Sequence, residues 1–432
     1  MSAPPGKLQR TLRLPDLIIM GLILIQPTAP MPLFGVVFEK ASGHVVTAIL
    51  VAMVGMMCTA WSYGRMSQVY PSAGSAYTYV GRTLHPGLGY LAGWSMLMDY
   101  VLNPLICTIW CAKAAANILP MLPLAALKIF FALLFTALNL RRIESTARTN
   151  QILAAGMGAV IVWMLAATVQ WVAAHPATDF LKPFYDPAHF DASNFATATS
   201  LAVLTYIGFD AISTLSEEVQ NPRRNVLLGT VLVCLIIGVL SAIEVYAGQL
   251  IWPVGEKFPD VDTAYVFVAG RAGGPWLFQA VNLTLLLATI GSGAGAQMAG
   301  ARLLFGMGRE DNLPKSFFGR IDPRSGVPTR NVLLIGAIAL TGSLLISYET
   351  GAELLNFGAF VGFMGVNIAA LRHFGFNPVP VVGFLVCAFL WWNLTPPART
   401  AGLIWLAVGL VYGYYSTKGF SQPLSALDST VE

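Results

Sequence analysis

Long runs of apolar residues dominate the chain, and short polar segments separate them. A helix that crosses the roughly 30 Å hydrocarbon core of a bilayer needs about 20 such residues. The pattern predicts about twelve membrane-spanning helices, with eleven as the alternative because runs 123–140 and 378–394 are short. The twelve runs are residues 16–38, 44–69, 87–117, 123–140, 150–172, 194–216, 226–251, 275–306, 331–348, 353–371, 378–394 and 400–415.

The composition agrees with this pattern. Apolar residues form 56% of the 432-residue chain and charged residues 11%, whereas an average soluble domain is about 25% charged. A soluble protein of this length would need a charged surface to cover its core. The sequence therefore predicts an all-α integral membrane protein, multi-pass in the cell (inner) membrane, with the lipid bilayer as a partner and no nucleic acid.

The lysines and arginines orient the predicted helices. Cytoplasmic loops carry an excess of these residues, and cytoplasmic termini would put 18 of the 25 on the cytoplasmic side and 7 elsewhere. The reverse orientation inverts this ratio, so we expect both termini in the cytoplasm. The first apolar run is too long for a signal peptide, and no cleavable signal is expected.

The segments between and beside the runs are short. Residues 1–14 and 416–432 are polar tails, and residues 173–193 form either a folded extracellular lid or a plain connector. No Walker-type phosphate loop is present, which excludes an ATPase module. The five cysteines lie in apolar runs without metal-ligand spacing, so we expect no cofactor, metal or disulfide.

Prolines interrupt the first run at mid-membrane depth. Residues 25–35 read IQPTAPMPLFG, and each proline costs about 3 kcal/mol in a helix interior. Unwound backbone at this depth survives where it is buried in protein or lines a cavity; a kinked helix without a ligand is the alternative. The candidate binding residues at this break are Gln26, Pro27, Thr28, Ala29, Pro30 and Met31.

A second interruption lies in the sixth run, where residues 206–214 read YIGFDAIST. An ionisable residue at the bilayer centre costs at least about 2.5–3.5 kcal/mol and usually marks a pathway or an internal partner. Interruptions in the first and sixth runs hold equivalent places in two five-helix halves, an arrangement typical of inverted-repeat transporters with a midplane site. The candidates here are Tyr206, Gly208, Phe209, Asp210 and Ala211.

Several motifs resemble the amino acid–polyamine–organocation (APC) permeases. They are YPSAGSAYTY at 70–79, GW at 93–94, GFDA at 208–211, EEVQNPRR at 217–224 and RLLFGMGRED at 302–311. The resemblance spans roughly residues 10–415, with the motifs in the family's order. It implies a LeuT-type 5+5 inverted repeat formed by residues 15–172 and 194–373, with peripheral helices in 374–415. It also implies that the substrate lies between the broken helices one and six.

Two features depart from the usual pattern of that family. The first-helix break is usually rich in glycine, whereas Gln26-Pro27 with further prolines resembles the putrescine-importer branch. Some proton-coupled members carry a lysine on the fifth helix near the first break, and the matching position here is Met157. A proton remains the expected coupling ion, but coupling through that lysine is in doubt.

Three carboxylates inside the predicted spans each have two interpretations. Asp99, beside Tyr100, is either a cation ligand or proton acceptor, or a structural partner of Lys113 or of a neighbouring helix. Asp210 belongs to the site or caps free N–H groups of the break. Glu244 carries a proton if it is buried, or has a structural role near the outer surface. Asp99, Tyr100, Asp210 and Glu244 complete the candidate binding residues.

Two further groups of residues have competing interpretations. Glu217, Glu218 and Arg223 form either a gate of ion pairs at the cytoplasmic end of the sixth span or a solvated charge cluster. The small residues at 291–296 favour close helix packing over binding, although Ser292 could contribute to a cation site.

Together these features predict a secondary transporter that imports or exchanges a small amino compound by alternating access. Three intramembrane carboxylates and the Gln-Pro break favour a putrescine-like polyamine, whereas helix N-termini at the breaks favour an amino-acid carboxylate. The alternatives are a neutral or cationic amino-acid permease of the same fold and a transporter-like substrate sensor. No enzyme is expected, because the spans contain no nucleophile–base or metal constellation.

Overall fold

The computed structural model describes residues 12–70, 75–141, 147–216, 218–309, 313–322 and 325–416. These residues form α-helices joined by short connections, and Leu12 and Val219 pair as an isolated parallel bridge. The elements are α1 Leu14–Ile25, α2 Phe34–Lys40, α3 Val45–Val69, α4 Ser75–Thr83, α5 Pro86–Ala116, α6 Leu124–Leu140, α7 Ala147–Ala174, α8 Ala192–Ala202, η1 Val203–Tyr206, α9 Ala211–Thr214, α10 Pro222–Ile251, α11 Ala264–Arg309, α12 Thr329–Leu345, α13 Tyr348–Phe374, α14 Pro378–Trp392 and α15 Pro396–Ser416.

Seven of the described helices are long and apolar enough to cross a membrane. They are α3, α5, α7, α10, α11, α13 and the stretch 192–213 that includes α8. Three apolar helices, α1, α6 and α12, are shorter, and α14 and α15 form a pair bent by 112°. Each of the twelve predicted runs therefore contains helix, and the chain is a multi-span membrane protein.

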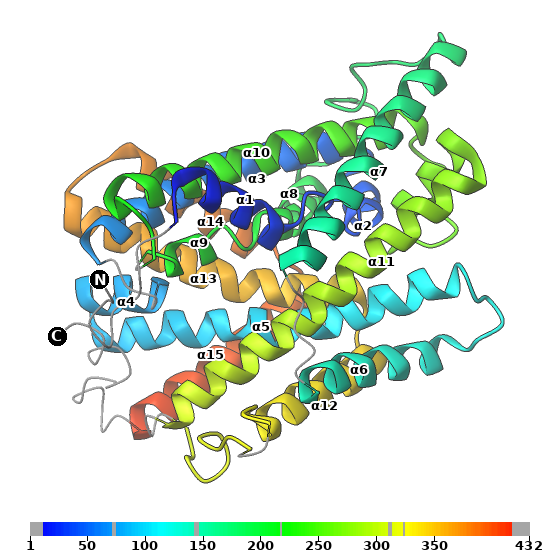
Figure 1. Cartoon of the computed structure of the whole chain (residues 1–432). Coiled ribbons are helices and arrows are strands. Elements are labelled where there is room, and N and C mark those ends of the chain that lie inside the picture. Colours follow the sequence, from blue (N-terminus) through cyan, green and yellow to red (C-terminus); the bar gives the residue numbers. More distant parts are fainter. Residues whose placement is uncertain are drawn as a thin grey trace.

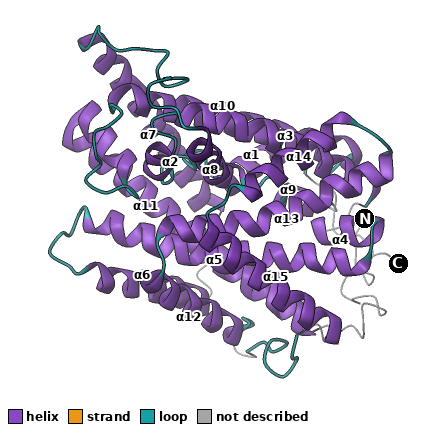
Figure 2. Cartoon of the chain, turned by 180° about the vertical axis from the view of Figure 1, so that it is seen from behind, coloured by secondary structure: helices purple, strands orange, loops and turns teal. Residues whose placement is uncertain are grey.

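Glycines allow several helices to approach closely, which is how helices associate where the surrounding lipid is as apolar as their side chains. A Cβ atom on Gly64 of α3 would lie 2.6 Å from the Cα atom of Leu227 on α10. A Cβ atom on Gly358 of α13 would overlap the Ser95 carbonyl oxygen of α5. Helix α5 lies between α13, α11 and α12, and α3 lies beside α10 (Figures 1 and 2).

The bundle has two distinct ends. At one, called the lid end, lie the loops 175–191 and 252–263; at the other, called the terminal end, Leu12 pairs with Val219 (Figure 1). Helix α5 runs from the terminal end to the lid end, and α11 runs back. The position of a residue along α5 or α11 therefore shows how near it lies to the lid end or to the terminal end.

Loop 175–191 is folded onto the lid end. The backbone N–H of Asp186 donates to Nε2 of the buried His44 at 2.8 Å, and the Tyr246 hydroxyl donates to the Phe180 carbonyl at 3.0 Å. The Thr47 hydroxyl donates to the Phe184 carbonyl at 2.6 Å. The segment is therefore folded onto this end of the bundle, and its role as a lid stays a prediction.

Both predicted interruptions are present. The first helix stops at Ile25 and resumes as α2 at Phe34, with turns between them. The sixth run is helical only to Tyr206 and turns through residues 207–210 before the short α9. A third interruption, at Gly273 and Gly274 inside α11, coincides with the predicted start of the eighth run at residue 275.

Candidate functional site

A cavity of about 380 Å³, here called the central cavity, lies where the two breaks meet. Its wall combines the end of α1, the middle of α5, the first half of α7, the second break and the middle of α11. The lining residues are Ile23, Leu24, Gln26, Asp99, Tyr100, Asn103, Leu153, Ala154, Met157, Ile207, Gly208, Asp210, Ala211, Ala288, Gly291, Ser292, Gly295, Ala296 and Ala299.

A smaller cavity of about 120 Å³, the narrow cavity, adjoins it on the lid side. Its α5 residues, from Asn103 to Trp110, lie nearer the lid end than those of the central cavity, which begin at Asp99. The two cavities share a ring of lining residues, called the waist. The waist consists of Leu24, Gln26, Asn103, Ile207 and Ser292.

The first break is held between α11 and α7. Gln26 adopts a left-handed backbone with φ of 73°, and its Nε2 donates to the Ala288 carbonyl of α11 at 3.1 Å. The buried Thr28 hydroxyl donates to Sδ of Met157 on α7 at 3.4 Å. Met157 therefore does lie beside the first break, as the family resemblance implied for this position of the fifth helix. A thioether in this position cannot carry a charge.

The second break depends on Gly208 and Asp210. Gly208 has φ of 119°, a conformation that suits glycine, and an added Cβ would lie 3.0 Å from Cγ1 of Ile25. The Asp210 carboxylate accepts from the Gly208 N–H at 3.3 Å, and its carbonyl accepts from the Ser213 hydroxyl at 2.6 Å. Asp210 thus both caps the unwound segment and lines the cavity.

Two carboxylates, those of Asp99 and Asp210, face the same cavity from different helices. No lysine, arginine or histidine stands among the described residues that line it. The interpretation of Asp99 as a partner of Lys113 is wrong: Lys113 lies at the lid end and pairs with Asp260 at 3.0 Å and Asp262 at 2.6 Å. The described lining of the central cavity is therefore acidic.

Other candidate residues lie outside the lining of the central cavity. Tyr206 is fully buried and donates its hydroxyl to the Ile49 carbonyl at 2.8 Å, and the Phe209 ring packs on Tyr63 and Phe363. Glu244 is buried elsewhere along α10. Ala29 lines the narrow cavity instead, and neither cavity is lined by Pro27, Thr28, Pro30 or Met31. The breaks thus contribute some side chains to the site and others to the packing around it.

The predicted gate residues make backbone contacts. Glu217 lies outside the described residues. The Glu218 carbonyl accepts from the Leu12 N–H at 3.0 Å, and the Arg223 carbonyl accepts from Gln68. In the described part of the chain no ion pair joins Glu218 to Arg223, and the gate of ion pairs and the solvated charge cluster both stay predictions.

The sequence analysis did not identify Asn103 as a cavity residue. It also favoured packing for the small-residue face of α11, part of which lines the cavity. Asn103 stands one turn beyond Asp99, and its polarity inside an apolar span was the available signal. On α11, Gly291 and Gly295 have open space where a Cβ would lie, and both line the central cavity. A Cβ on Gly293 would instead lie 2.6 Å from the Phe135 ring. The face is therefore divided between lining the cavity and packing against other helices.

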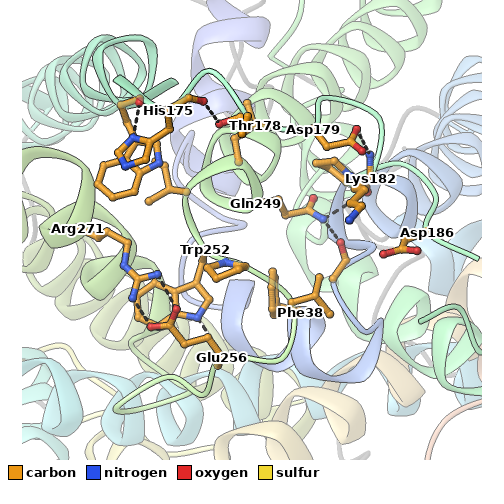
Figure 3. A pocket seen from close by; sticks show the side chains of 18 of the residues that line it. Phe38, His175, Thr178, Asp179, Lys182, Asp186, Gln249, Trp252, Glu256 and Arg271 are labelled. Atoms are coloured by element: carbon orange, nitrogen blue, oxygen red, sulfur yellow. Dashed lines mark hydrogen bonds and ion pairs between the residues drawn. The ribbon is translucent and has the colours of Figure 1, made fainter. Parts of the chain in front are cut away.

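A third cavity, the loop cavity of about 650 Å³, lies at the lid end (Figure 3). Loops 175–191 and 252–263 and the ends of α7 and α10 enclose it, and it shares no lining residue with the central cavity. Figure 3 shows the Arg271 guanidinium beside Trp252 and paired with Glu256. The Arg271 Cζ lies 3.7 Å from the Trp252 ring centroid.

A multi-span helical protein with a polar cavity at the meeting point of two broken helices has the architecture of a membrane permease. The chain belongs to the amino acid permease family, whose model matches residues 18–420.

Its relatives are transporters. The chain is 33% identical to the low-affinity putrescine importer PlaP of Escherichia coli (strain K12), over 97% of this chain and 96% of the relative. It is 26% identical to a methylthioribose transporter of Bacillus subtilis (strain 168), over 95% and 94%. It is 25% identical to the branched-chain amino acid permease BcaP of Lactococcus lactis subsp. cremoris (strain MG1363), over 93% and 94%.

Proposed function

We propose that this permease is a secondary transporter that imports or exchanges a small amine of the putrescine type by alternating access. The substrate binds in the central cavity, with its ammonium groups at Asp99 and Asp210. The observation that carries this proposal is the pair of carboxylates in one cavity without a cationic side chain in the described lining. A low-dielectric site with this charge favours a cation over a zwitterion.

The waist lies on the route that the substrate would take between the two cavities. Gln26 and Ile207 belong to the two breaks, and both line the narrow and the central cavity. Movement of the half-helices at these breaks would open one cavity while closing the other, as alternating access requires. The same residues would therefore bind the substrate and separate the two sides.

The membrane topology belongs to the same proposal. The seven long helices, the short helices α1–α2, α6 and α12, and α14 and α15 taken singly add up to twelve spans. We propose that the first ten form a LeuT-type inverted repeat with breaks in the first and sixth. The terminal end faces the cytoplasm of a bacterial cell, and the chain lies in the inner membrane. The positive-inside distribution of lysine and arginine supports this orientation.

We further propose that a proton is the coupling ion and that the chain has no enzymatic activity. Met157, in place of a lysine, removes one coupling site known from the resemblance. In this proposal the carboxylates of Asp99 and Asp210 bind the ammonium groups of the substrate. The coupling proton therefore binds to a different residue.

Substitution of the two cavity carboxylates tests the site. Asp99→Asn and Asp210→Asn keep the side-chain shape, and the amide oxygen introduced by Asp210→Asn can still accept from the Gly208 N–H. Loss of a charge-assisted hydrogen bond costs about 1.5–3 kcal/mol, so we expect kcat/KM for labelled putrescine in proteoliposomes to fall about 10- to 100-fold. Asp16→Asn, at the exposed start of α1, is the control and should leave uptake unchanged.

The same vesicles decide between substrates. Uptake of leucine instead of putrescine would support the alternative, a neutral amino-acid permease of the same fold. Transport of neither compound would contradict the proposed function and favour a substrate sensor. Unchanged putrescine uptake by both Asn variants would remove Asp99 and Asp210 from the site.

A further inference from the structure

Glu244 on α10 is buried without a partner. Its side chain is 1% exposed, and neither carboxylate oxygen has a hydrogen-bond partner among the described residues. Glu353 on α13 is equally buried, but its carboxylate accepts a hydrogen bond from the Thr395 hydroxyl. The two residues therefore differ in their surroundings more than in their burial.

An ionised carboxylate in such a place is unstable. Transfer of an unpaired charge from water into a low-dielectric interior costs several kcal/mol or more even after relaxation, whereas a neutral group without a hydrogen bond costs about 1–3 kcal/mol. Burial without a partner therefore favours the neutral carboxylic acid form of Glu244 over the ionised form. A proton held only by desolvation is released when water or a cation reaches the carboxylate.

The residues around Glu244 connect it to the half-helix α2. The Tyr265 hydroxyl of α11 donates to the Glu244 carbonyl at 2.9 Å. One turn further along α10, a Cβ on Gly248 would lie 3.0 Å from the Phe34 ring and 3.2 Å from the Tyr265 ring. Phe34 is the first residue of α2, and its ring packs edge-on against Tyr265 at 5.3 Å.

The loop cavity ends close to this aromatic contact. Gln249, Leu250 and Ile251 of α10 line it, as does Phe38 of α2 (Figure 3). Gln249 is five residues beyond Glu244, or about 7.5 Å along the helix. Movement of α2 away from α10 would remove Phe34 and Phe38 together and admit water from the loop cavity towards the carboxylate.

No other charge competes for this proton among the described residues. The titratable group that faces Glu244 is Tyr265 of α11. The other described helices packed against α10 are α1, α3, α7, α9 and η1.

The described charged side chains of these helices lie at the ends of the bundle. Asp16 starts α1, and Arg65 of α3 lies over Phe374. On α2, Lys40 pairs with Glu349 at 2.7 Å, and Glu39 is exposed.

We propose that Glu244 is the proton-binding residue of this transporter, separate from the substrate cavity. In each cycle one proton from the solvent at the lid end binds the carboxylate and later leaves it towards the terminal end, which regenerates the carboxylate. Residues 26–33 join α2 to the central cavity. Binding of the proton and binding of the substrate thus both change the equilibrium position of residues 26–33 and α2. This common effect is the physical basis of coupling. The inference rests on the proposed function.

Glu244→Gln tests the inference in proteoliposomes with the membrane potential clamped at zero. A gradient of two pH units can drive about 100-fold accumulation when one proton accompanies each substrate. We expect the parent protein to accumulate labelled putrescine under this gradient and the Gln variant to lose the stimulation. Exchange of putrescine at equal pH should persist in the variant, because the central cavity is intact. Glu353→Gln is the matched control and should keep the stimulation.

The outcomes separate the two claims. If the parent protein exchanges no putrescine or amino acid, the proposed function fails and the inference with it. If the parent is stimulated by the gradient and Glu244→Gln is stimulated equally, the inference alone is overturned.

A second measurement needs no variant. Dicyclohexylcarbodiimide reacts with protonated carboxyl groups in apolar surroundings, and mass spectrometry of the modified parent protein locates the adduct. We expect labelling of Glu244 that decreases as the pH rises, together with loss of gradient-driven uptake. Labelling of Glu353 without labelling of Glu244 would overturn the inference, even if the Gln variant fails to fold.

Discussion

The two sides of the waist differ in the volume of the cavity that lies there and in the residues of its wall. On the lid side the narrow cavity measures about 120 Å³, and Trp110 and Tyr348 contribute to its wall. On the terminal side the central cavity measures about 380 Å³, and small residues of α11 form much of its wall. The space on the lid side of the waist is therefore narrower than the space on the terminal side.

Loop 252–263 crosses the lid side and contacts two helices there. Lys113 of α5 pairs with Asp260 and Asp262, and the Trp110 indole donates to the Asp262 carbonyl at 2.7 Å. On its other side the loop contacts α2: Phe258 packs edge-on against Phe38 at 5.3 Å. The loop therefore joins a fixed wall, α5, to the half-helix α2.

On the terminal side, two of the described ties are hydrogen bonds to backbone carbonyls. The N–H of Leu12 and the carbonyl of Glu218 form a backbone hydrogen bond, and Gln68 donates to the Arg223 carbonyl. In the described residues neither tie involves a pair of opposite charges. The comparison points to the polar contacts of loop 252–263 as the feature to test on the narrower side.

Removal of Lys113 should give the largest change. Burial raises the pKa of Asp262 and Lys113 opposes this rise, so Lys113→Met leaves two carboxylates without their shared cation. Loss of one partner of such a contact costs about 1–3 kcal/mol, which corresponds to a rise of about 5- to 100-fold in the lid-open population. Reaction of Cys107, in the narrow cavity, with a membrane-impermeant thiol reagent from the lid side measures this rise.

The measurement uses a protein in which Cys107 is the remaining cysteine, with Ala at positions 58, 111, 234 and 387. Lys128→Met is the matched control, because Lys128 donates to the Ser343 carbonyl at 2.6 Å and forms no ion pair with loop 252–263 among the described residues. An equal labelling rate in the Lys113 and Lys128 variants would show that the ion pairs do not hold the lid side closed.

A pair of glycines on α11 tests the central cavity with a smaller effect. Gly291 has open space where a side chain would extend, whereas a Cβ on Gly293 would meet Phe135 and Cys107 at 2.6 and 2.9 Å. Both changes to valine carry the same helix-propensity cost. We expect Gly291→Val to raise KM for putrescine about tenfold with little change in Tm, and Gly293→Val to cost roughly 1–3 kcal/mol of stability.

Thermal unfolding and uptake kinetics of the two variants separate these effects. If Gly291→Val lowers Tm as much as Gly293→Val and leaves KM unchanged, the face at Gly291 belongs to packing. The wider terminal side would then have no role in binding.

The helices and both breaks were predictable because their signals are local. Apolar runs of about 20 residues, three prolines within six positions, and Gly208 next to Asp210 each act within a few residues. Asp99 and Asp210 were also found as cavity residues, because a carboxylate inside an apolar span is costly unless it lines a polar space.

Other features depend on contacts between distant segments. The partners of Lys113 come from a loop about 150 residues away, and no pattern along α5 identifies them. Tyr206 and Phe209 were expected at the site, but an unwound segment has no fixed periodicity that tells which side chains face the cavity. The division of α11 into cavity and packing glycines likewise needs the neighbouring helices.

The smallest expected effect is at the outer edge of the lid. Hydrogen bonding from Arg271 lowers the pKa of Glu256 below its usual value. The stabilisation that this pair gives is fully present above the usual pKa of glutamate. It is lost as the pH falls through the lowered pKa of Glu256, because the carboxylate is then protonated. Since the usual pKa of glutamate is about 4.3, the tie should loosen only below about pH 4. Arg271 covers Trp252, and an acid-induced change in Trp252 fluorescence, isolated by comparison with Trp252→Phe, reports it.

Glu256→Gln should remove this acid transition and leave uptake at neutral pH within about twofold, because exposed pairs contribute little. Lys113 would still hold loop 252–263 on α5 in this variant. A large increase in Cys107 labelling by Glu256→Gln, comparable to that of Lys113→Met, would place the main closing contact at the outer edge of the lid instead of above the narrow cavity.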